Sequence, residues 1–224
     1  MKRSDDLMRR ALEVAASRRP VHPLEPDDLD DDLDDELSRV RAVGGADLYL
    51  ARWAGRIPSR FAWADLDAVA AIHPTIIDRL TEWALDPAGR NLVLFGPVGT
   101  GKSYTAVAAV RPACASGLEV QFLPVDELLD LLRPGGPDGA LYDLARIDRL
   151  IIDDIGAERA TDWTADRLSA LINRRWLEER PTVATTNLDA DALRAALGER
   201  TFSRLVGNDA VLLRLSGDDQ RRRR

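Results

Sequence analysis

Residues 96–103 carry the clearest chemistry in the sequence. They read Gly-Pro-Val-Gly-Thr-Gly-Lys-Ser, follow a short apolar segment and precede a segment with helical character. Glycines at this spacing let backbone N–H groups turn inward around phosphate oxygens, and the N-terminus of the following helix adds partial positive charge. We therefore predict a nucleoside triphosphate site in which Lys102 binds the terminal phosphates and Ser103 binds Mg²⁺. The predicted nucleotide-binding residues are Gly96, Pro97, Val98, Gly99, Thr100, Gly101, Lys102, Ser103 and, next along the helix, Tyr104.

Two carboxylates follow an apolar segment that ends at Ile152. In a parallel α/β sheet the carboxyl ends of the strands line the ligand crevice. Both carboxylate side chains are therefore expected beside the phosphate-binding loop. Asp153 is predicted to hold Mg²⁺, and Asp154 to orient or deprotonate an attacking water. Asn187 ends the next apolar segment and could bond the γ-phosphate or the same water, although asparagine at a strand end is also a common turn residue.

Short apolar segments alternate with helical ones from residue 91 onward, which predicts a parallel α/β sheet. The predicted strands are 91–95, 119–123, 150–153, 182–185 and 210–215, with helices after Lys102, Val125, Thr161 and Asp189. Pro112 lies about ten residues into the first of these helices and is expected to kink or end it. Upstream, residues 56–63 are predicted to be extended, and a helix is predicted to begin at Pro74 and to end near Asp86.

Charge and composition limit the class of protein. The 224 residues carry a net charge of −7 and include 31 lysines and arginines, of which only Lys2 and Lys102 are lysines. One cysteine and two histidines exclude a disulfide framework and a Cys/His zinc site. No apolar run approaches the roughly 18 residues of a membrane span, and no signal peptide is evident, so a cytoplasmic protein is expected.

The first 45 residues are predicted to be helical. A helix is expected over about 5–19, and an acidic segment from Glu25 to Glu36 carries nine carboxylates. Without those nine charges the rest of the chain is near neutral, at about +2. Leu29, Leu33 and Leu37 recur at helical spacing along the acidic segment and just beyond it, which favours an amphipathic helix over disorder. That helix could face a partner or cover the protein's own core.

These motifs together resemble an AAA+ ATPase, and more narrowly the DnaC/IstB-like branch of helicase loaders and transposition helper ATPases. The likeness covers roughly residues 56–221 and is most specific over 150–188, where the acidic strand precedes a Gly-Ala-Glu turn and a helix that contains tryptophan. It implies an α/β P-loop NTPase fold of the AAA+/ASCE type: a parallel five-stranded sheet flanked by helices, without a C-terminal lid domain and preceded by a small helical region. It also implies ATP and Mg²⁺ as cofactors.

The same resemblance assigns several other residues. Residues 198–205 are similar to the family's box VII, which implies that Arg204 is an arginine finger entering a neighbouring subunit's site, with Arg200 as its companion. Both could instead form surface salt bridges. Arg221 matches a second sensor arginine, but its run of four arginines could equally be a solvated tail or a DNA-binding patch. Residues 56–61 resemble the segment that leads into the family's nucleotide domain and lies near the adenine, so Ile57 and Phe61 are candidates for base contact or for simple core packing.

The expected function is that of an ATP-dependent helicase loader in DNA replication. Residues 1–45 would bind a DnaB-type replicative helicase, 46–63 would form a linker and lead-in, and 64–224 the ATPase core, which would self-associate or assemble on the helicase and contact single-stranded DNA. Asp154 stands where most AAA+ enzymes have glutamate, and its shorter reach implies slow hydrolysis. Arg204 as a finger implies that activity depends on concentration or on a partner. The alternatives are an IstB-like transposition helper and an ATP-binding adaptor that does not hydrolyse ATP.

Overall fold

The computed structural model describes residues 56–86, 89–158, 161–207, 209–217 and 219–220. Five strands form one parallel sheet in the order β2-β3-β4-β1-β5. Strand β4 lies between β1 and β3, and because the strands are parallel, the carboxyl ends of all three lie next to one another on the same side of the sheet. The strands are β1 (Leu92–Phe95), β2 (Val120–Pro124), β3 (Arg149–Ile155), β4 (Thr182–Thr186) and β5 (Val211–Arg214).

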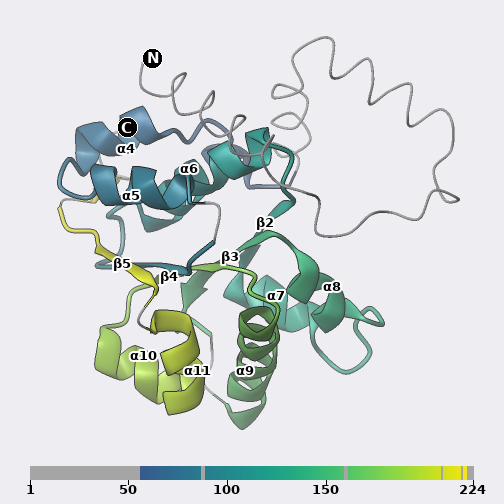
Figure 1. Cartoon of the computed structure of the whole chain (residues 1–224). Coiled ribbons are helices and arrows are strands. Elements are labelled where there is room, and N and C mark those ends of the chain that lie inside the picture. Colours follow the sequence, from purple (N-terminus) through teal and green to yellow (C-terminus); the bar gives the residue numbers. More distant parts are fainter. Residues whose placement is uncertain (1–55, 87–88, 159–160, 208, 218, 221–224) are drawn as a thin grey trace, which may run out of the picture.

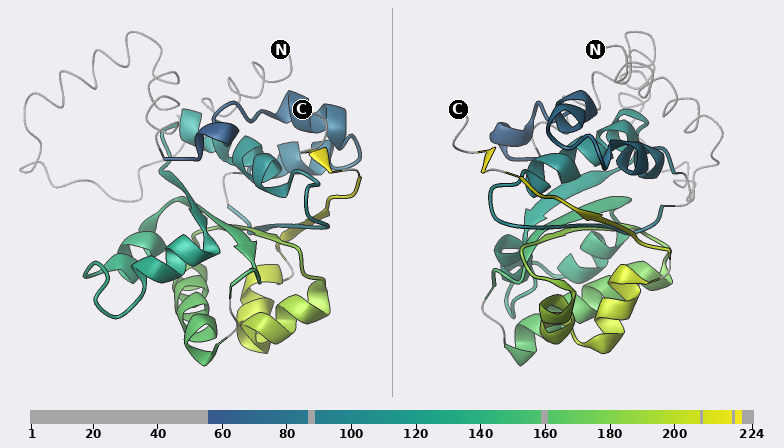
Figure 2. Two further views of the ribbon diagram at one scale, coloured as in Figure 1. Left: turned by 180° about the vertical axis from the view of Figure 1, so that it is seen from behind. Right: turned by 90° about the vertical axis from the view of Figure 1, so that its left-hand side faces the viewer.

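Helices cover both faces of the sheet, which gives three layers (Figures 1 and 2). One face carries α4 (Leu66–Ile72), α5 (Ile77–Ala84) and α6 (Lys102–Ala115), preceded by the 3-10 turn η2 (Ser59–Phe61). The other carries α7 (Val125–Leu131), α8 (Ala140–Arg146), α9 (Asp162–Leu177), α10 (Ala190–Leu197) and α11 (Glu199–Val206). The predicted α/β fold with a five-stranded parallel sheet is confirmed.

Apolar strand residues alternate between the two cores, as the period of a β-strand requires. Leu92 and Leu94 of β1 pack under α6, whereas Val93 between them packs on the opposite face. In β3, Ile151 joins the first core and Ile152 the second. Because both faces are covered, β1 and the first half of β3 carry unbroken apolar runs, residues 92–95 and 150–152, which is why they could be recognised in the sequence.

One local prediction is wrong, and at Pro112 one of the two expected outcomes is excluded. Residues 56–63 are not extended: Pro58 (φ −53°) begins the turn η2, and the Phe61 N–H donates to the Pro58 carbonyl at 2.8 Å. Helix α6 does not end at Pro112 but continues to Ala115. Proline in the last turn of a helix removes only one N–H donor, and the Pro112 carbonyl still accepts from the Ser116 N–H at 3.1 Å.

A buried arginine ties the second helical layer to the sheet. Arg175 near the end of α9 is completely buried, and burial together with nearby Arg180 and Arg149 lowers its pKa below the usual value. Its guanidinium donates to oxygens of two separate segments, the end of α8 and the start of β4. The acceptors are the carbonyl oxygens of Leu144, Ala145, Ile147 and Pro181 and the Thr182 hydroxyl.

Candidate functional site

The loop between β1 and α6 can take its shape only with glycine at several positions. Gly96, Gly99 and Gly101 all have positive φ, at 149°, 84° and 89°. A Cβ on Gly96 would lie 2.1 Å from the Leu215 carbonyl oxygen, and one on Gly99 would lie 2.3 Å from an Asp219 carboxylate oxygen. The loop is therefore held against the segment that follows β5, and its backbone N–H groups are presented at the N-terminus of α6.

Lys102 is buried at the centre of this loop, with 7% of its surface exposed. Its ammonium donates to the carbonyl oxygens of Gly96 and Pro97, each at 2.9 Å, and to Asn187 Oδ1 at 2.6 Å. Asn187 in turn donates through Nδ2 to Asp154 Oδ1 at 2.5 Å. Three residues that the sequence placed on separate segments thus form one continuous hydrogen-bonded chain.

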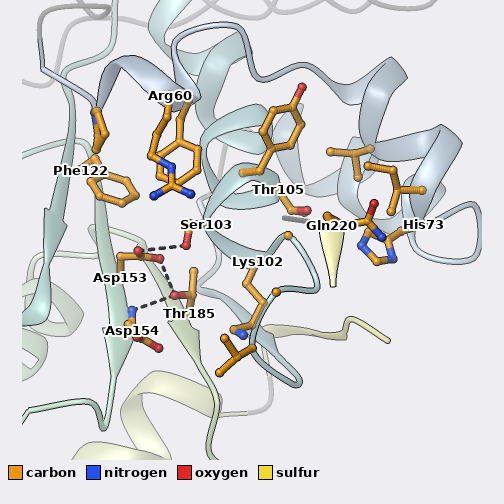
Figure 3. Close-up of a pocket in the computed structure, with 18 of the residues that line it drawn as sticks. Arg60, His73, Lys102, Ser103, Thr105, Phe122, Asp153, Asp154, Thr185 and Gln220 are labelled. Carbon is orange, nitrogen blue, oxygen red and sulfur yellow. Dashed lines mark hydrogen bonds between the residues drawn. The ribbon is translucent and has the colours of Figure 1, made fainter. Parts of the chain in front are cut away.

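A second set of contacts joins α6 to the ends of β3 and β4. Ser103 Oγ donates to Asp153 Oδ2 at 3.0 Å, and Thr185 Oγ1 donates to Asp153 Oδ1 at 2.6 Å (Figure 3). Burial raises the pKa of Asp153, while the two hydroxyl groups partly offset that effect. A hydroxyl and a single carboxylate are the protein ligands that Mg²⁺ takes when nucleotide phosphates and water complete its shell. The pair Ser103 and Asp153 therefore fits the predicted metal.

Asp154 lies at an irregularity in β3. Its φ is +64°, and the register with β4 shifts between Ile152 and Ile155. The Asp154 N–H donates to Thr185 Oγ1 at 2.8 Å, so the same hydroxyl group fixes the backbone of Asp154 and the carboxylate of Asp153. The bulge turns the two consecutive carboxylates toward different partners, which gives them separate environments.

These residues open onto a cavity of about 800 Å³. The loop residues Val98, Gly99 and Gly101 to Tyr104 line it, together with Asp153, Asp154, Thr185 and Asn187. Gly96, Pro97 and Thr100 are not among its lining residues; Thr100 is buried and donates through Oγ1 to the Pro97 carbonyl at 2.9 Å. Most predicted nucleotide-binding residues are therefore brought together around one cavity.

Other cavity residues were missed by the sequence reasoning. Thr185 lies two residues before Asn187, and its place near the end of β4 could have marked it as a candidate site residue. His73 follows α4, and its Nε2 lies 2.8 Å from the Thr100 carbonyl oxygen, so it supports the loop from outside the motif. No local pattern marks that contact, because the two residues are 27 positions apart. Arg60, Phe122 and Gln220 also line the cavity.

Of the two candidates for base contact, Phe61 and Ile57, only Phe61 lines the cavity. Phe61 lines the cavity, and its ring lies 5.8 Å from that of Phe122. Ile57 does not line it; this residue is 6% exposed and belongs to the apolar core. Arg221 and the two predicted N-terminal helices lie outside the described residues.

Arg204 lies far from the cavity of its own chain. The Arg204 carbonyl accepts from Asn91 Nδ2 at 2.9 Å, just before β1 begins, whereas the cavity lies where β1 ends. Its guanidinium carbon lies 4.8 Å from the centre of the Trp176 ring, which is half exposed. Arg200 on the same helix is exposed. Arg204 is thus presented at a surface on the opposite edge of the sheet.

The model of the IstB-like ATP-binding protein family matches residues 53–219, which is more than half of the chain and includes every cavity residue except Gln220. The chain belongs to this family. Its fold and its phosphate-binding loop are therefore those of an ATP-binding P-loop protein of the AAA+ class, as the sequence predicted.

Similar proteins fall into two groups. The replicative helicase loader DnaC of Escherichia coli is 27% identical over 139 residues, which are 59% of this chain and 57% of that protein. An ATP-binding protein of an insertion sequence from Pseudomonas fluorescens is 35% identical over 102 residues, 44% of each chain. The chain thus spans about half the length of the curated relatives it matches.

Solved structures show the same fold. A crystal structure of the DnaC helicase loader superposes with a TM-score of 0.64 at 24% identity, covering 71% of this chain and 100% of that one. A crystal structure of DnaI gives 0.62 at 22% identity, covering 73% and 94%. Among the described residues, no helix is long and apolar enough to cross a membrane.

Proposed function

We propose that this protein is a cytoplasmic ATP-dependent helicase loader that binds ATP with Mg²⁺ and hydrolyses it slowly. The observation that carries the proposal is the convergence of Lys102, Asn187 and Asp154 with the pair Ser103 and Asp153 in one cavity. The similarity to DnaC in sequence and fold supports the loader assignment. Residues 1–45 are proposed to bind the replicative helicase, and the core to contact single-stranded DNA.

The cavity residues divide the chemistry between them. Lys102 and the loop N–H groups bind the β- and γ-phosphates, for which the ammonium leaves its present carbonyl partners. Mg²⁺, held by Ser103 and Asp153, would neutralise charge on the phosphate oxygens. Asp154 accepts a proton from, or orients, the attacking water, and Asn187 holds the Asp154 carboxylate toward the γ-phosphate.

Arg204 completes the site of a second protomer in this proposal. It lies at the opposite edge of the sheet from its own cavity, so it can reach a γ-phosphate only across an interface. A planar guanidinium remains charged at any physiological pH and can stabilise the charge that develops on the transferred phosphoryl group. Hydrolysis should therefore require either self-association or assembly on the helicase.

Mixing the protein with the replicative helicase of its host tests the loader proposal. We expect a complex by size-exclusion chromatography with light scattering, and a different stoichiometry or stability with ATP than without it. The insertion-sequence relatives favour a second candidate, an IstB-like transposition helper. A complex with a transposase and none with the helicase would contradict the loader proposal and support the helper.

Arg204→Ala is expected to keep ATP affinity within about twofold and to reduce partner-stimulated hydrolysis by about 10³-fold or more, as loss of an arginine finger does. ATP titration and phosphate release with helicase and single-stranded DNA measure the two effects. Arg194→Ala is a matched control, since Arg194 is exposed on α10 and pairs with Asp191 and Glu199. A normal stimulated rate in Arg204→Ala would exclude Arg204 as the finger.

A further inference from the structure

Arg60 lines the nucleotide cavity from a segment that carries none of the motif residues. Its side chain points into the cavity, toward Ser103 and Asp153 (Figure 3). The guanidinium carbon lies 5.0 Å from the centre of the Phe61 ring, so the group is stacked on an aromatic face. The positive charge of Arg60 is therefore directed at the side of the cavity where Ser103 and Asp153 lie.

The turn that carries Arg60 is anchored on both sides. Ile57 is buried in the apolar core, and the Phe61 ring packs against Phe122 of β2. The hydrogen bond from the Phe61 N–H to the Pro58 carbonyl closes the turn between these anchors. A rigid backbone of this kind reduces the entropy that an arginine loses when it binds a ligand.

Arg60 makes no ion pair or hydrogen bond with another residue in the described part of the chain. Its neighbours behave differently: Arg56 pairs with Glu119 at 3.1 Å, and Arg111 donates to the Ala64 carbonyl at 3.0 Å. Asp153 and Asp154 line the same cavity but lie beyond ion-pair distance of Arg60. The N–H groups of this guanidinium are thus available to an anion in the cavity.

We propose that Arg60 binds the terminal phosphate of the bound nucleoside triphosphate in cis, from the side opposite Lys102. The proposal rests on the proposed ATP-binding function. Ser103 and Asp153 would hold the Mg²⁺ that accompanies the terminal phosphates, and Arg60 is directed at that place. Planar guanidinium groups match phosphate oxygens in a bidentate arrangement, and such charged hydrogen bonds are among the strongest in proteins.

This contact would give the site a means to distinguish ATP from ADP within one protomer. In this proposal Arg60 reaches the terminal phosphate of its own protomer, whereas Arg204 can reach only the phosphate bound to a neighbouring protomer. The turn η2 would then be held more firmly when the γ-phosphate is present. This turn lies near the start of the family match, which begins at residue 53.

The test compares affinities of wild type, Arg60→Ala and Arg60→Lys for a non-hydrolysable ATP analogue, ADP and oligodeoxythymidylate by calorimetry. Arg60→Ala is expected to bind the ATP analogue about ten- to hundredfold more weakly and ADP within about threefold of wild type. Arg60→Lys should recover only part of the loss, because an ammonium keeps the charge without the planar fork. Arg56→Ala, which removes a nearby exposed arginine paired with Glu119, should change neither affinity by more than about twofold.

Several outcomes would overturn the assignment of Arg60. Unchanged affinity of Arg60→Ala for the ATP analogue would do so, as would an equal loss for ATP and ADP. If Arg60→Ala bound the oligonucleotide more weakly but kept its affinity for both nucleotides, Arg60 would bind a phosphate of DNA and not that of ATP. If wild type bound the ATP analogue no better than Lys102→Ala, the proposed function itself would fail, and the role of Arg60 with it.

Discussion

Lys102→Ala is expected to reduce ATP affinity at least about a hundredfold while leaving the fold intact. The lysine contributes charged hydrogen bonds to phosphate oxygens worth roughly 1.5–3 kcal/mol each, and two of them already exceed that factor. In the structure its ammonium donates to the oxygens of Gly96, Pro97 and Asn187. Lys102 and Asn187 line an open cavity, so water can replace the lost donor.

Calorimetric titration with the ATP analogue measures the affinity, and circular dichroism with thermal melting verifies the fold. Thr105→Val is not a suitable control, because Thr105 also lines the cavity. Arg133→Ala serves better, since this exposed arginine pairs with Asp130 at 3.0 Å and lies outside the cavity. Nucleotide affinity that survives in Lys102→Ala would contradict the assignment of residues 96–103 as the phosphate-binding loop.

The use of lysine at position 102, in a chain rich in arginine, follows from the geometry of the loop. Arg175 shows what arginine does in this fold: its flat, rigid group is fixed among oxygens that stay in place. Lys102 instead bonds three oxygens that converge on one point, and in the proposed function it exchanges its carbonyl partners for phosphate. A compact ammonium on a flexible stem can do this, whereas a guanidinium would need a wider space.

The parts predicted correctly are those in which local pattern and tertiary environment agree. Strands β1 and β3 are apolar because both faces are covered, and the glycines of the loop are required by backbone approach. The short helices α4 and α8 were missed. The helix predicted after Asp189 is two helices, because Gly198 with φ +76° separates α10 from α11.

The missed cavity residues share a different cause. The sequence analysis assigned no role to His73 or Arg60, and only the packing of α4 and η2 beside α6 places these two residues at the cavity. Long-range contacts of this kind depend on the whole arrangement of layers. By contrast, Asp153, Asp154 and Asn187 could be assigned because strand ends in a parallel sheet meet at a known edge.

Asp154→Asn is expected to bind ATP within about threefold of wild type and to hydrolyse it at least about a hundredfold more slowly, the usual contribution of a general base. The substitution should preserve the local structure. The φ of +64° is one that asparagine adopts as readily as aspartate, and the new amide oxygen can still accept from Asn187 Nδ2. What is lost is the negative charge and the ability to take a proton from water.

Phosphate release in the presence of the helicase and single-stranded DNA measures this loss. Asp191→Asn is a matched control, because Asp191 is exposed on α10 and lies outside the cavity. If wild type hydrolyses ATP no faster than Asp154→Asn under these conditions, the protein is an ATP-binding adaptor and not an ATPase. Because Asp154 contacts Asn187 and Asn187 contacts Lys102, weakened ATP binding together with slow hydrolysis would instead mean that the hydrogen-bonded chain acts as one unit.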